Sequence, residues 1–221
     1  MRTITAFIFT ALISGFSSLF SQNDSVKYTP DFKFVDGIYR TFEEFKENNP
    51  SIKRKAVLDD NPGMQFFVGR FTKAEKIAYK DSTGNMQIIK RKDVWGYCSN
   101  DVVYIKYNRN FHRILKIGSI IFFIELYNTS TTYYQDPIKF IPYFRTNSSI
   151  EYQYIIDFKT GDILKYDLNN FLALLFDDKD LYNKFMAIPS DRKRKKQMFN
   201  YLNKFNERNP VYFKLNPNKQ F

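Results

Sequence analysis

Turn-forming residues interrupt the middle of the chain at short intervals, and this spacing constrains the fold more than any other feature. Between residues 51 and 166 the apolar stretches are short, and segments rich in Asn, Asp, Gly and Pro separate them. The first predicted strands are 52–58, 64–71, 76–80, 86–95, 102–107, 111–117 and 120–127. Connections this short join only antiparallel neighbours, because a parallel pair needs a crossover of about a dozen residues. The sequence therefore predicts an antiparallel meander.

The clearest strand follows a less regular stretch. Residues 128–135 are polar and are predicted to form a longer loop, and residues 136–146 are predicted to be irregular around two prolines. From residue 150 to 158 apolar and polar side chains alternate with a period of two, which is typical of a half-buried strand. A Lys-Thr-Gly-Asp turn then leads back into a last predicted strand at 163–166.

Helical patterns flank the strands on both sides. Thr41 followed by Glu44 is a capping-box spacing, which predicts a short helix that starts at Phe42. Three more helices are predicted after the strands, each opened by capping residues. The first is capped by Asp167 with Leu168, Phe171, Leu172 and Leu175 facing inward, the second opens at Asp177 and Asp178 with Leu181, Phe185 and Ile188 inward, and the third opens at 189–191 with Met198, Tyr201, Leu202 and Phe205 inward.

Together these elements predict an α+β fold in one domain. We expect a meander of about eight or nine strands, as a sheet, a roll or a small barrel, with a short N-terminal helix and a C-terminal three-helix segment packed on it. The domain is expected to span residues 22–221, with a β-rich part at 51–166 and a helical part at 167–209. A single Cys allows no internal disulfide, so the 24 Phe and 16 Tyr must supply most of the core.

The first 21 residues have the layout of a secretory signal peptide. Arg2 gives a positive start, residues 4–13 form a short apolar segment, and small and polar residues follow. Cleavage is expected near Ser21, so the chain is predicted to be exported to the periplasm or the medium. No later segment reaches the ~20 apolar residues of a membrane span.

The stretch 93–127 contains the only Trp, the only Cys and the only His of the chain, and it therefore attracts a search for an active site. Cys98 and His112 are the candidate catalytic residues, as a dyad that Asp93 or Asp101 would orient. As a lone cysteine, Cys98 is instead interpreted as a small buried hydrophobe. Strand alternation puts His112 on the face opposite Phe111, Leu115 and Ile117, which predicts a partly exposed surface residue. The apolar residues on both faces of 121–124 predict a central segment, covered on one side by the C-terminal helices.

The chain lacks the short sequence motifs of the common catalytic and cofactor-binding sites. It has no nucleophile elbow, phosphate-binding loop, dinucleotide fingerprint or zinc-binding Cys pair. One His excludes a site built from several histidines, and we expect neither a metal nor a cofactor. The acidic group Asp177, Asp178 and Asp180 lacks the spacing of a calcium loop and is interpreted as the start of a helix.

The strongest charged feature is a basic run near the C-terminus, made of Arg192, Lys193, Arg194, Lys195 and Lys196. Residues 190–221 carry nine Lys and Arg against two Asp and Glu, within a net charge of +11 for the chain. The simpler interpretation is a solvated charge run, and the alternative is an anion-binding site for a lipid, a polysaccharide or an acidic protein. Cations at a helix start oppose the helix dipole, so either the helix begins near Lys196 or an anionic group compensates.

These observations favour a non-enzymatic binding or structural module of the cell envelope or the medium. The alternatives are an anion-binding protein that uses residues 192–196, and a hydrolase without a recognisable motif. Nucleic acid is not an expected partner, because the chain is predicted to be exported and shows no nucleic-acid-binding module.

Three short segments carry a resemblance that spans most of the chain. They are DGIYRTFEEFKENNPSI at 36–52, WGYCSNDVVYI at 95–105 and FNYLNKFNERNP at 199–210. Together they resemble a group of uncharacterised exported proteins of Bacteroidota. The resemblance implies export and this architecture, and it implies no activity and no site residues.

Overall fold

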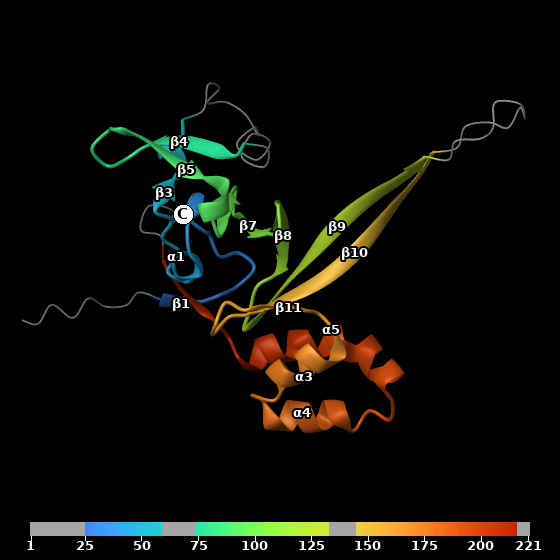
Figure 1. The fold of residues 1–221 in the computed structure, drawn as a ribbon. Helices are drawn as coiled ribbons and strands as arrows, with labels where there is room; N and C mark the ends of the chain where they lie inside the picture. The colour runs from blue at the N-terminus through green and yellow to red at the C-terminus, as the bar shows by residue number, and fades with distance from the viewer. Residues whose placement is uncertain (1–24, 59–73, 133–144, 216–221) are drawn as a thin grey trace, which may run out of the picture.

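The computed structural model describes residues 25–58, 74–132 and 145–215, and the predicted strand at 64–71 lies outside them. The chain is built on an antiparallel sheet of eight strands in the order β11-β10-β9-β8-β7-β6-β2-β3, with two further strand pairs, β1-β12 and β4-β5 (Figure 1). The strands of the sheet are β2 (Gly37–Tyr39), β3 (Ile52–Lys53), β6 (Gly96–Ser99), β7 (Val102–Tyr107), β8 (Asn110–Lys116), β9 (Ile120–Thr132), β10 (Arg145–Asp157) and β11 (Ile163–Lys165). The other strands are β1 (Ser25–Lys27), β12 (Tyr212–Lys214), β4 (Lys76–Lys80) and β5 (Met86–Lys90).

The predicted α+β class and the antiparallel meander are confirmed. Strands β6 to β11 follow one another in space as they do in sequence, and every pairing in the sheet is antiparallel. Of the predicted alternatives the structure is an open sheet, since β11 and β3 lie at opposite ends of the strand order.

Two predicted strands are interrupted by short 3-10 turns. In place of the predicted strand at 52–58, the structure has β3 followed by a 3-10 turn at Arg54–Ala56. In place of the predicted strand at 86–95, it has β5 and a 3-10 turn at Arg91–Asp93, and β6 follows from Gly96. Each turn begins with an Arg-Lys pair whose side chains stay at least partly exposed. Continuing either strand would have alternated these charged groups between the two faces, so the local charge pattern opposes a regular strand.

The predicted loop at 128–135 was wrong in part, as was the irregular segment at 136–146. β9 continues to Thr132 and β10 already starts at Arg145, and the two pair without a break along 13 residues each. The pairing of β9 with β8 ends at Phe123. The outer part of the β9-β10 ribbon projects from the body of the protein (Figure 1). We call residues 124–132 and 145–153 the arm. Its outer part is Asn-, Ser- and Thr-rich, so no apolar alternation marks it as strand, although Thr is well suited to a strand.

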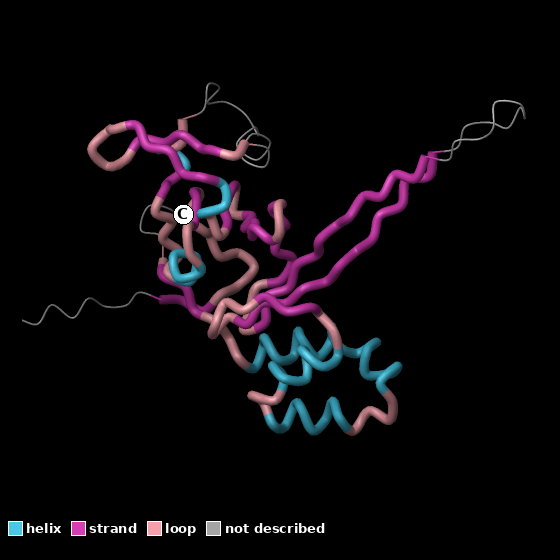
Figure 2. The backbone as a smooth tube through the Cα atoms, viewed as in Figure 1, coloured by secondary structure: helices cyan, strands magenta, loops and turns pink. Residues whose placement is uncertain are grey.

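The predicted helices are confirmed together with their caps. α1 (Phe42–Lys46) starts after Thr41, whose hydroxyl accepts a hydrogen bond from the Glu44 amide. The C-terminal helices are α3 (Leu168–Leu175), α4 (Lys179–Met186) and α5 (Asp191–Arg208), capped by Asp167, Asp178 and Ser190. Figure 2 shows these three helices gathered together, apart from α1. No helix in the described part of the chain is long and apolar enough to cross a membrane.

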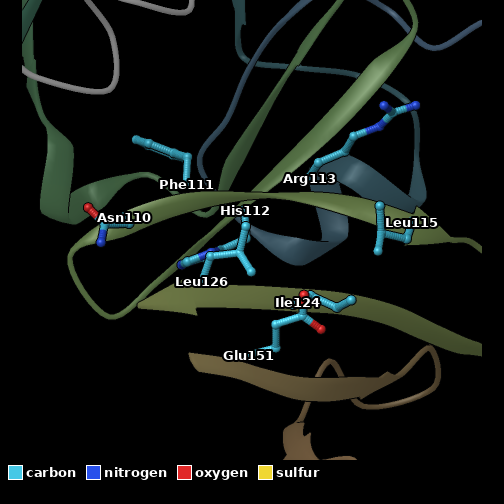
Figure 3. A pocket seen from close by; sticks show the side chains of 8 residues that line it. All are labelled: Asn110, Phe111, His112, Arg113, Leu115, Ile124, Leu126 and Glu151. Atoms are coloured by element: carbon cyan, nitrogen blue, oxygen red, sulfur yellow. The ribbon is translucent and has the colours of Figure 1, made fainter. Parts of the chain in front are cut away.

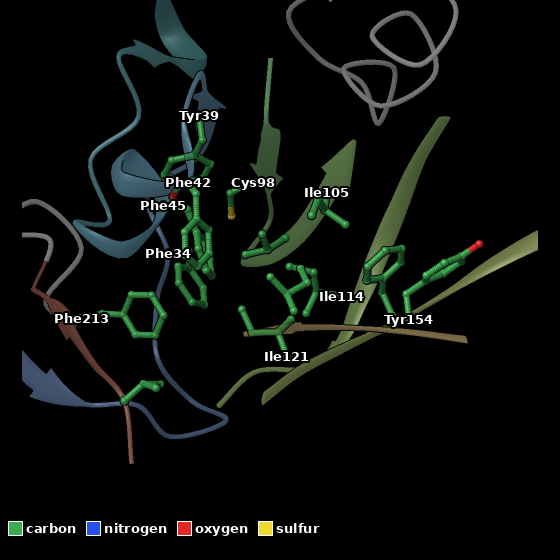
Figure 4. Close-up of a cluster of buried hydrophobic side chains, with 14 residues drawn as sticks. Phe34, Tyr39, Phe42, Phe45, Cys98, Ile105, Ile114, Ile121, Tyr154 and Phe213 are labelled. Atoms are coloured by element: carbon green, nitrogen blue, oxygen red, sulfur yellow. The ribbon is translucent and has the colours of Figure 1, made fainter. Parts of the chain in front are cut away.

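The sheet is covered on both faces by three apolar clusters. The inner cluster lies on one face and joins the sheet to α1, β12 and the segment before β2 (Figure 4). Its members are Phe34, Tyr39, Phe42, Phe45, Cys98, Val103, Ile105, Ile114, Ile121, Phe123, Tyr154, Ile156, Val211 and Phe213. Trp95 packs against it with its ring 4.9 Å from that of Phe45, and Gly96 lies against the Tyr104 carbonyl so closely that a Cβ would meet it at 2.4 Å. Trp95 and Gly96 therefore lie in the packed centre of the molecule.

The opposite face is shared between the C-terminal helices and the β4-β5 hairpin. The helical cluster places Ile120, Phe122 and Ile155 of the sheet against the buried faces of α3, α4 and α5. The hairpin cluster places Ile77 and Ile89 of β4 and β5 over the other end of the sheet. The predicted contact of the 121–124 segment with the helices is therefore confirmed.

One side chain fixes α5 to the first residue of β9. The amide of Asn206 accepts a hydrogen bond from the Ile120 N–H at 2.8 Å and donates one to the Ile120 carbonyl at 2.8 Å. The Asn206 side chain thus makes the two backbone hydrogen bonds that a neighbouring strand would otherwise make with Ile120. Gly118 permits the approach, because a Cβ there would lie 2.3 Å from Cγ of Asn206.

We therefore predict that Asn206→Ala lowers the free energy of unfolding by about 1–3 kcal/mol, because the Ile120 N–H and carbonyl would be left without a partner in a buried place. Denaturant unfolding measures the change. Asn200→Ala on the same helix is the control, since Asn200 is exposed and hydrogen-bonds only Gln197 among the described contacts. Equal losses in the two variants would contradict this role of Asn206.

Candidate functional site

Cys98, the first candidate catalytic residue, is part of the core. It lies on β6 with no exposed surface and belongs to the inner cluster. Its thiol donates a hydrogen bond to Oδ1 of Asp36 at 3.5 Å. The predicted small buried residue is confirmed, and the thiol has no open path to a substrate in this structure.

His112, the second candidate, is separated from Cys98 by a strand. Cys98 pairs with Val103 and His112 pairs with Ile105, so β7 runs between them and they are also offset along it. Two strand spacings amount to about 10 Å. This is far beyond hydrogen-bond reach, so the structure does not bring the dyad together.

The prediction that His112 is a partly exposed surface residue was wrong. Only 8% of its surface is accessible, and it shares the inner face with Ile105 and Ile114. Alternation predicts an exposed His112 only if the face of the sheet that carries Phe111 is the single covered face. Phe111 is indeed covered, but by the hairpin cluster on the other face. Because both faces are covered here, alternation does not reveal an exposed side.

His112 instead belongs to a buried polar group around Glu125, which is 1% exposed. The Asn108 side-chain amide donates to both carboxylate oxygens of Glu125 at 3.1 Å. Nε2 of His112 lies 3.6 Å from Oε1 and has no hydrogen-bond partner among the described atoms. Tyr127 and Tyr154 also hydrogen-bond to Glu125, and burial raises the pKa of Tyr154 to about 12. No motif or spacing in the sequence marks Glu125 as a member of a buried polar group.

This polar group marks the place where β8 and β9 part. The two strands pair only at Ile114–Phe123 and Lys116–Phe122, with a register irregularity between the two pairs. Beyond this point a groove of about 480 Å³ opens at the fork (Figure 3). Its lining residues are Asn110, Phe111, His112, Arg113, Leu115, Ile124, Leu126 and Glu151. Asn108, at the tip of the β7-β8 turn, holds the two sides of the fork together through Glu125.

The basic run forms the first turns of α5, and an anionic residue compensates its charge. The helix begins at Asp191, not near Lys196, and the Ser190 hydroxyl accepts a hydrogen bond from the Lys193 amide. Oδ1 of Asp191 lies 3.2 Å from the Arg194 guanidinium, whose Nε also donates to the Ile188 carbonyl. Of the two explanations for cations at a helix start, the compensating anion is the one observed.

A second groove, of about 390 Å³, lies along α5 and collects part of this run. Its lining residues are Ile188, Lys193, Lys196, Gln197, Asn200, Tyr201 and Lys204. Lys193, Lys196 and Lys204 are exposed, and none of the three has an ion pair among the described residues. Two uncharged amides lie between them. The groove therefore offers three ammonium groups and hydrogen-bonding amides along one helix face.

The structure divides the five predicted anion-binding residues. Lys193 and Lys196 line the groove, whereas Arg194 is turned inward to its carbonyl and carboxylate partners. Arg192 and Lys195 do not line the groove. Lys204 was missed, although the spacing i, i+3, i+7 and i+11 of 193, 196, 200 and 204 would have found it.

The acidic residues at the start of α4 form ion pairs with basic side chains of the same chain. Arg208 lies 2.7 Å from Asp178 and 2.8 Å from Asp180, and Lys184 lies 2.8 Å from Asp180. Asp178 also accepts a hydrogen bond from the Leu181 amide, as a helix cap does. Within the described ranges no three His, Cys, Asp or Glu side chains are grouped to hold a metal ion.

Comparison with known proteins shows one match. Residues 37–209 match the model of a family of unknown function, DUF6563. The chain belongs to this family. No curated protein and no solved structure is significantly similar to it. The match covers more than half of the chain, and the resemblance to an uncharacterised group is confirmed to that extent.

In this DUF6563 chain the matched segment runs from the first residue of β2 to the C-cap of α5. It therefore contains all eight strands of the main sheet, the Glu125 group and the α5 groove. The pair β1-β12 lies outside the match, although β12 supplies Phe213 to the inner cluster.

The buried histidine gives a prediction about pH. Burial lowers the pKa of His112 below its ordinary value of 6.5, against the opposing effects of Glu125 and of nearby carbonyl groups. The unfolded chain then takes up this proton more readily than the folded one. The contribution of neutral His112 to the free energy of unfolding is therefore fully present above about pH 6.5, and it is lost as the pH falls below that value. Because the chain has one His, NMR titration of a single imidazole measures its pKa directly.

His112→Gln is the matched variant for that measurement. Urea unfolding between about pH 7.5 and pH 5.5 should show a smaller loss of stability in the variant than in the unmodified chain. An imidazole pKa at or above 6.5, or the same loss in both chains, would contradict the assignment.

Proposed function

We propose that this DUF6563 chain is an exported, non-enzymatic binding module that attaches to an anionic partner through the α5 groove. The signal-peptide pattern of the first 21 residues supports export. The lack of contact between Cys98 and His112 speaks against thiol chemistry. Glu125 is 1% exposed, and its two oxygens already accept hydrogen bonds, which speaks against a general base at the fork.

The observation that carries the proposal is the row of three lysines in one groove. Lys193, Lys196 and Lys204 stand on one exposed face of a helix that is fixed to the core by Asn206. Arg194, by contrast, is neutralised locally by Asp191. If the basic run were only a solvated charged surface, there would be no reason for the cations of the groove to lack ion pairs while Arg194 has one.

The groove suits phosphate or carboxylate groups that repeat along a surface or a polymer. Three ammonium groups set along a helix face make contact by charge, and the amides of Gln197 and Asn200 add hydrogen bonds. Exposed charges of this kind are screened within about 8 Å at physiological salt, so binding must weaken as salt rises. An anionic lipid headgroup and an acidic polysaccharide share the required chemistry.

The test is binding of the chain without residues 1–21 to vesicles that contain an anionic phospholipid, with vesicles of a zwitterionic phospholipid and an immobilised acidic polysaccharide as further arms. A variant with Lys193→Gln, Lys196→Gln and Lys204→Gln should bind roughly 100-fold more weakly, at about 1 kcal/mol for each basic residue near an anionic surface. Loss from the vesicles alone identifies lipid, and loss from the polymer alone identifies polysaccharide.

The control removes the same charge elsewhere. Lys76→Gln, Lys80→Gln and Lys90→Gln take three exposed lysines from the β4-β5 hairpin, so the net charge falls equally. We expect this variant to bind almost as well as the unmodified chain. Equal weakening in both variants would show a general charge effect, and salt-independent or undetectable binding in every arm would overturn the proposal.

A further inference from the structure

The arm leaves one long strand edge without a partner. Beyond Phe123, β9 pairs only with β10 in the described part of the chain, because its pairing with β8 has ended. Alternate residues along 124–132 thus direct their backbone N–H and carbonyl groups away from β10. At the base of this row the backbone of Ile124 already interacts with the His112 imidazole. An isolated two-stranded ribbon is of marginal stability in water, and an open edge is a template for another strand.

This edge differs from the outer edges of the main sheet and of the two strand pairs that the structure describes. Lysine stands in each strand at the other edges, and charged lysines protect an edge against unwanted pairing. These lysines are Lys27 in β1, Lys53 in β3, Lys76 and Lys80 in β4, Lys90 in β5, Lys165 in β11 and Lys214 in β12. β10 includes one basic residue, Arg145, in its sequence, and its Glu151 is exposed. Residues 124–132 contain no Lys, Arg, Pro or Gly, in a chain with 34 Lys and Arg.

The single charge in this strand segment is turned away from solvent. Glu125 is 1% exposed and is held by Asn108 at the base of the arm. Next to it, Leu126 and Tyr127 are 56% and 45% exposed, and the opposite strand adds Ile150 at 46% and Tyr152 at 42%. The arm therefore combines an unprotected edge with exposed apolar side chains, which marks an interaction surface.

We propose that this edge of β9 pairs antiparallel with the same edge of a second copy of the chain, about a two-fold axis. A strand whose single charged residue is buried gives no exposed charge by which to select an acidic or basic partner, whereas it is complementary to itself. Full overlap of 124–132 is centred on Asn128 and places Glu125 opposite Thr131, so no like charges meet. An interface of this kind is isologous, with the same residues contributed by both copies.

Because the arm extends from the body, two copies can pair through it without bringing their positively charged bodies close together. Nine residues of strand span about 30 Å, which exceeds the screening length of about 8 Å. Two copies joined at their arms therefore keep their basic α5 helices apart. In Figure 1 the arm extends away from α5. Pairing through α5 itself would instead bring like charges together.

The first test is the mass in solution of the chain without residues 1–21, measured by light scattering after gel filtration. We expect twice the monomer mass at tens of micromolar. Asn128→Lys should return the monomer, because two lysines would face each other at the centre of the pairing. Ile88→Lys is the control, since it puts the same charge on the exposed strand β5, where Ile88 is 65% exposed, and it should stay dimeric.

A cross-link tests the register without relying on a destabilising change. Asn128→Cys should form an intermolecular disulfide under mild oxidation, whereas Lys165→Cys on the edge strand β11 should not; Cys98 does not compete, since it has no exposed surface. A monomer at every concentration, including one that binds an extended segment of another protein, would overturn the proposal. So would a dimer that persists in Asn128→Lys, or equal cross-linking at the two positions.

Discussion

The structure depends on four consecutive apolar residues at the start of β9 that pack on both faces of the sheet. Ile121 and Phe123 enter the inner cluster, and Ile120 and Phe122 enter the helical cluster; all four are at most 5% exposed. A strand with two covered faces is common in the centre of layered folds, where each face needs its own cover. Here the second cover is the three-helix segment, and Asn206 ties it to the backbone of Ile120.

The elements with strong local signals could be predicted from the sequence. Thr41, Asp167, Asp178 and Ser190 cap their helices as their side chains suggested, because a cap is a local hydrogen bond between near neighbours. The short turns also predicted the antiparallel order correctly. The outer arm could not be predicted in this way, because its strands are polar on both sides and only their pairing with each other makes them regular.

The site residues were harder to predict than the fold, since they depend on contacts between distant strands. His112 and Glu125 are 13 residues apart in sequence, and only the antiparallel approach of β8 and β9 brings them together at the fork. The unusual residues of the 93–127 stretch are thus mainly core residues and one buried polar group. The basic run, by contrast, was recognised by charge alone, and the structure added Lys204 and set Arg192, Arg194 and Lys195 apart.

We expect the sheet and the C-terminal helices to unfold as one cooperative unit joined through β9, as the prediction of a single domain also requires. The most direct test of this expectation is denaturant unfolding followed by two probes on the same sample. Fluorescence of the single Trp95 reports the inner cluster, and far-ultraviolet circular dichroism reports mainly the C-terminal helices. Coincident transitions are expected, because exposing Ile120 and Phe122 on one face removes support from Ile121 and Phe123 on the other. Helices that unfold at a lower denaturant concentration, while Trp95 keeps its native signal, would contradict the account.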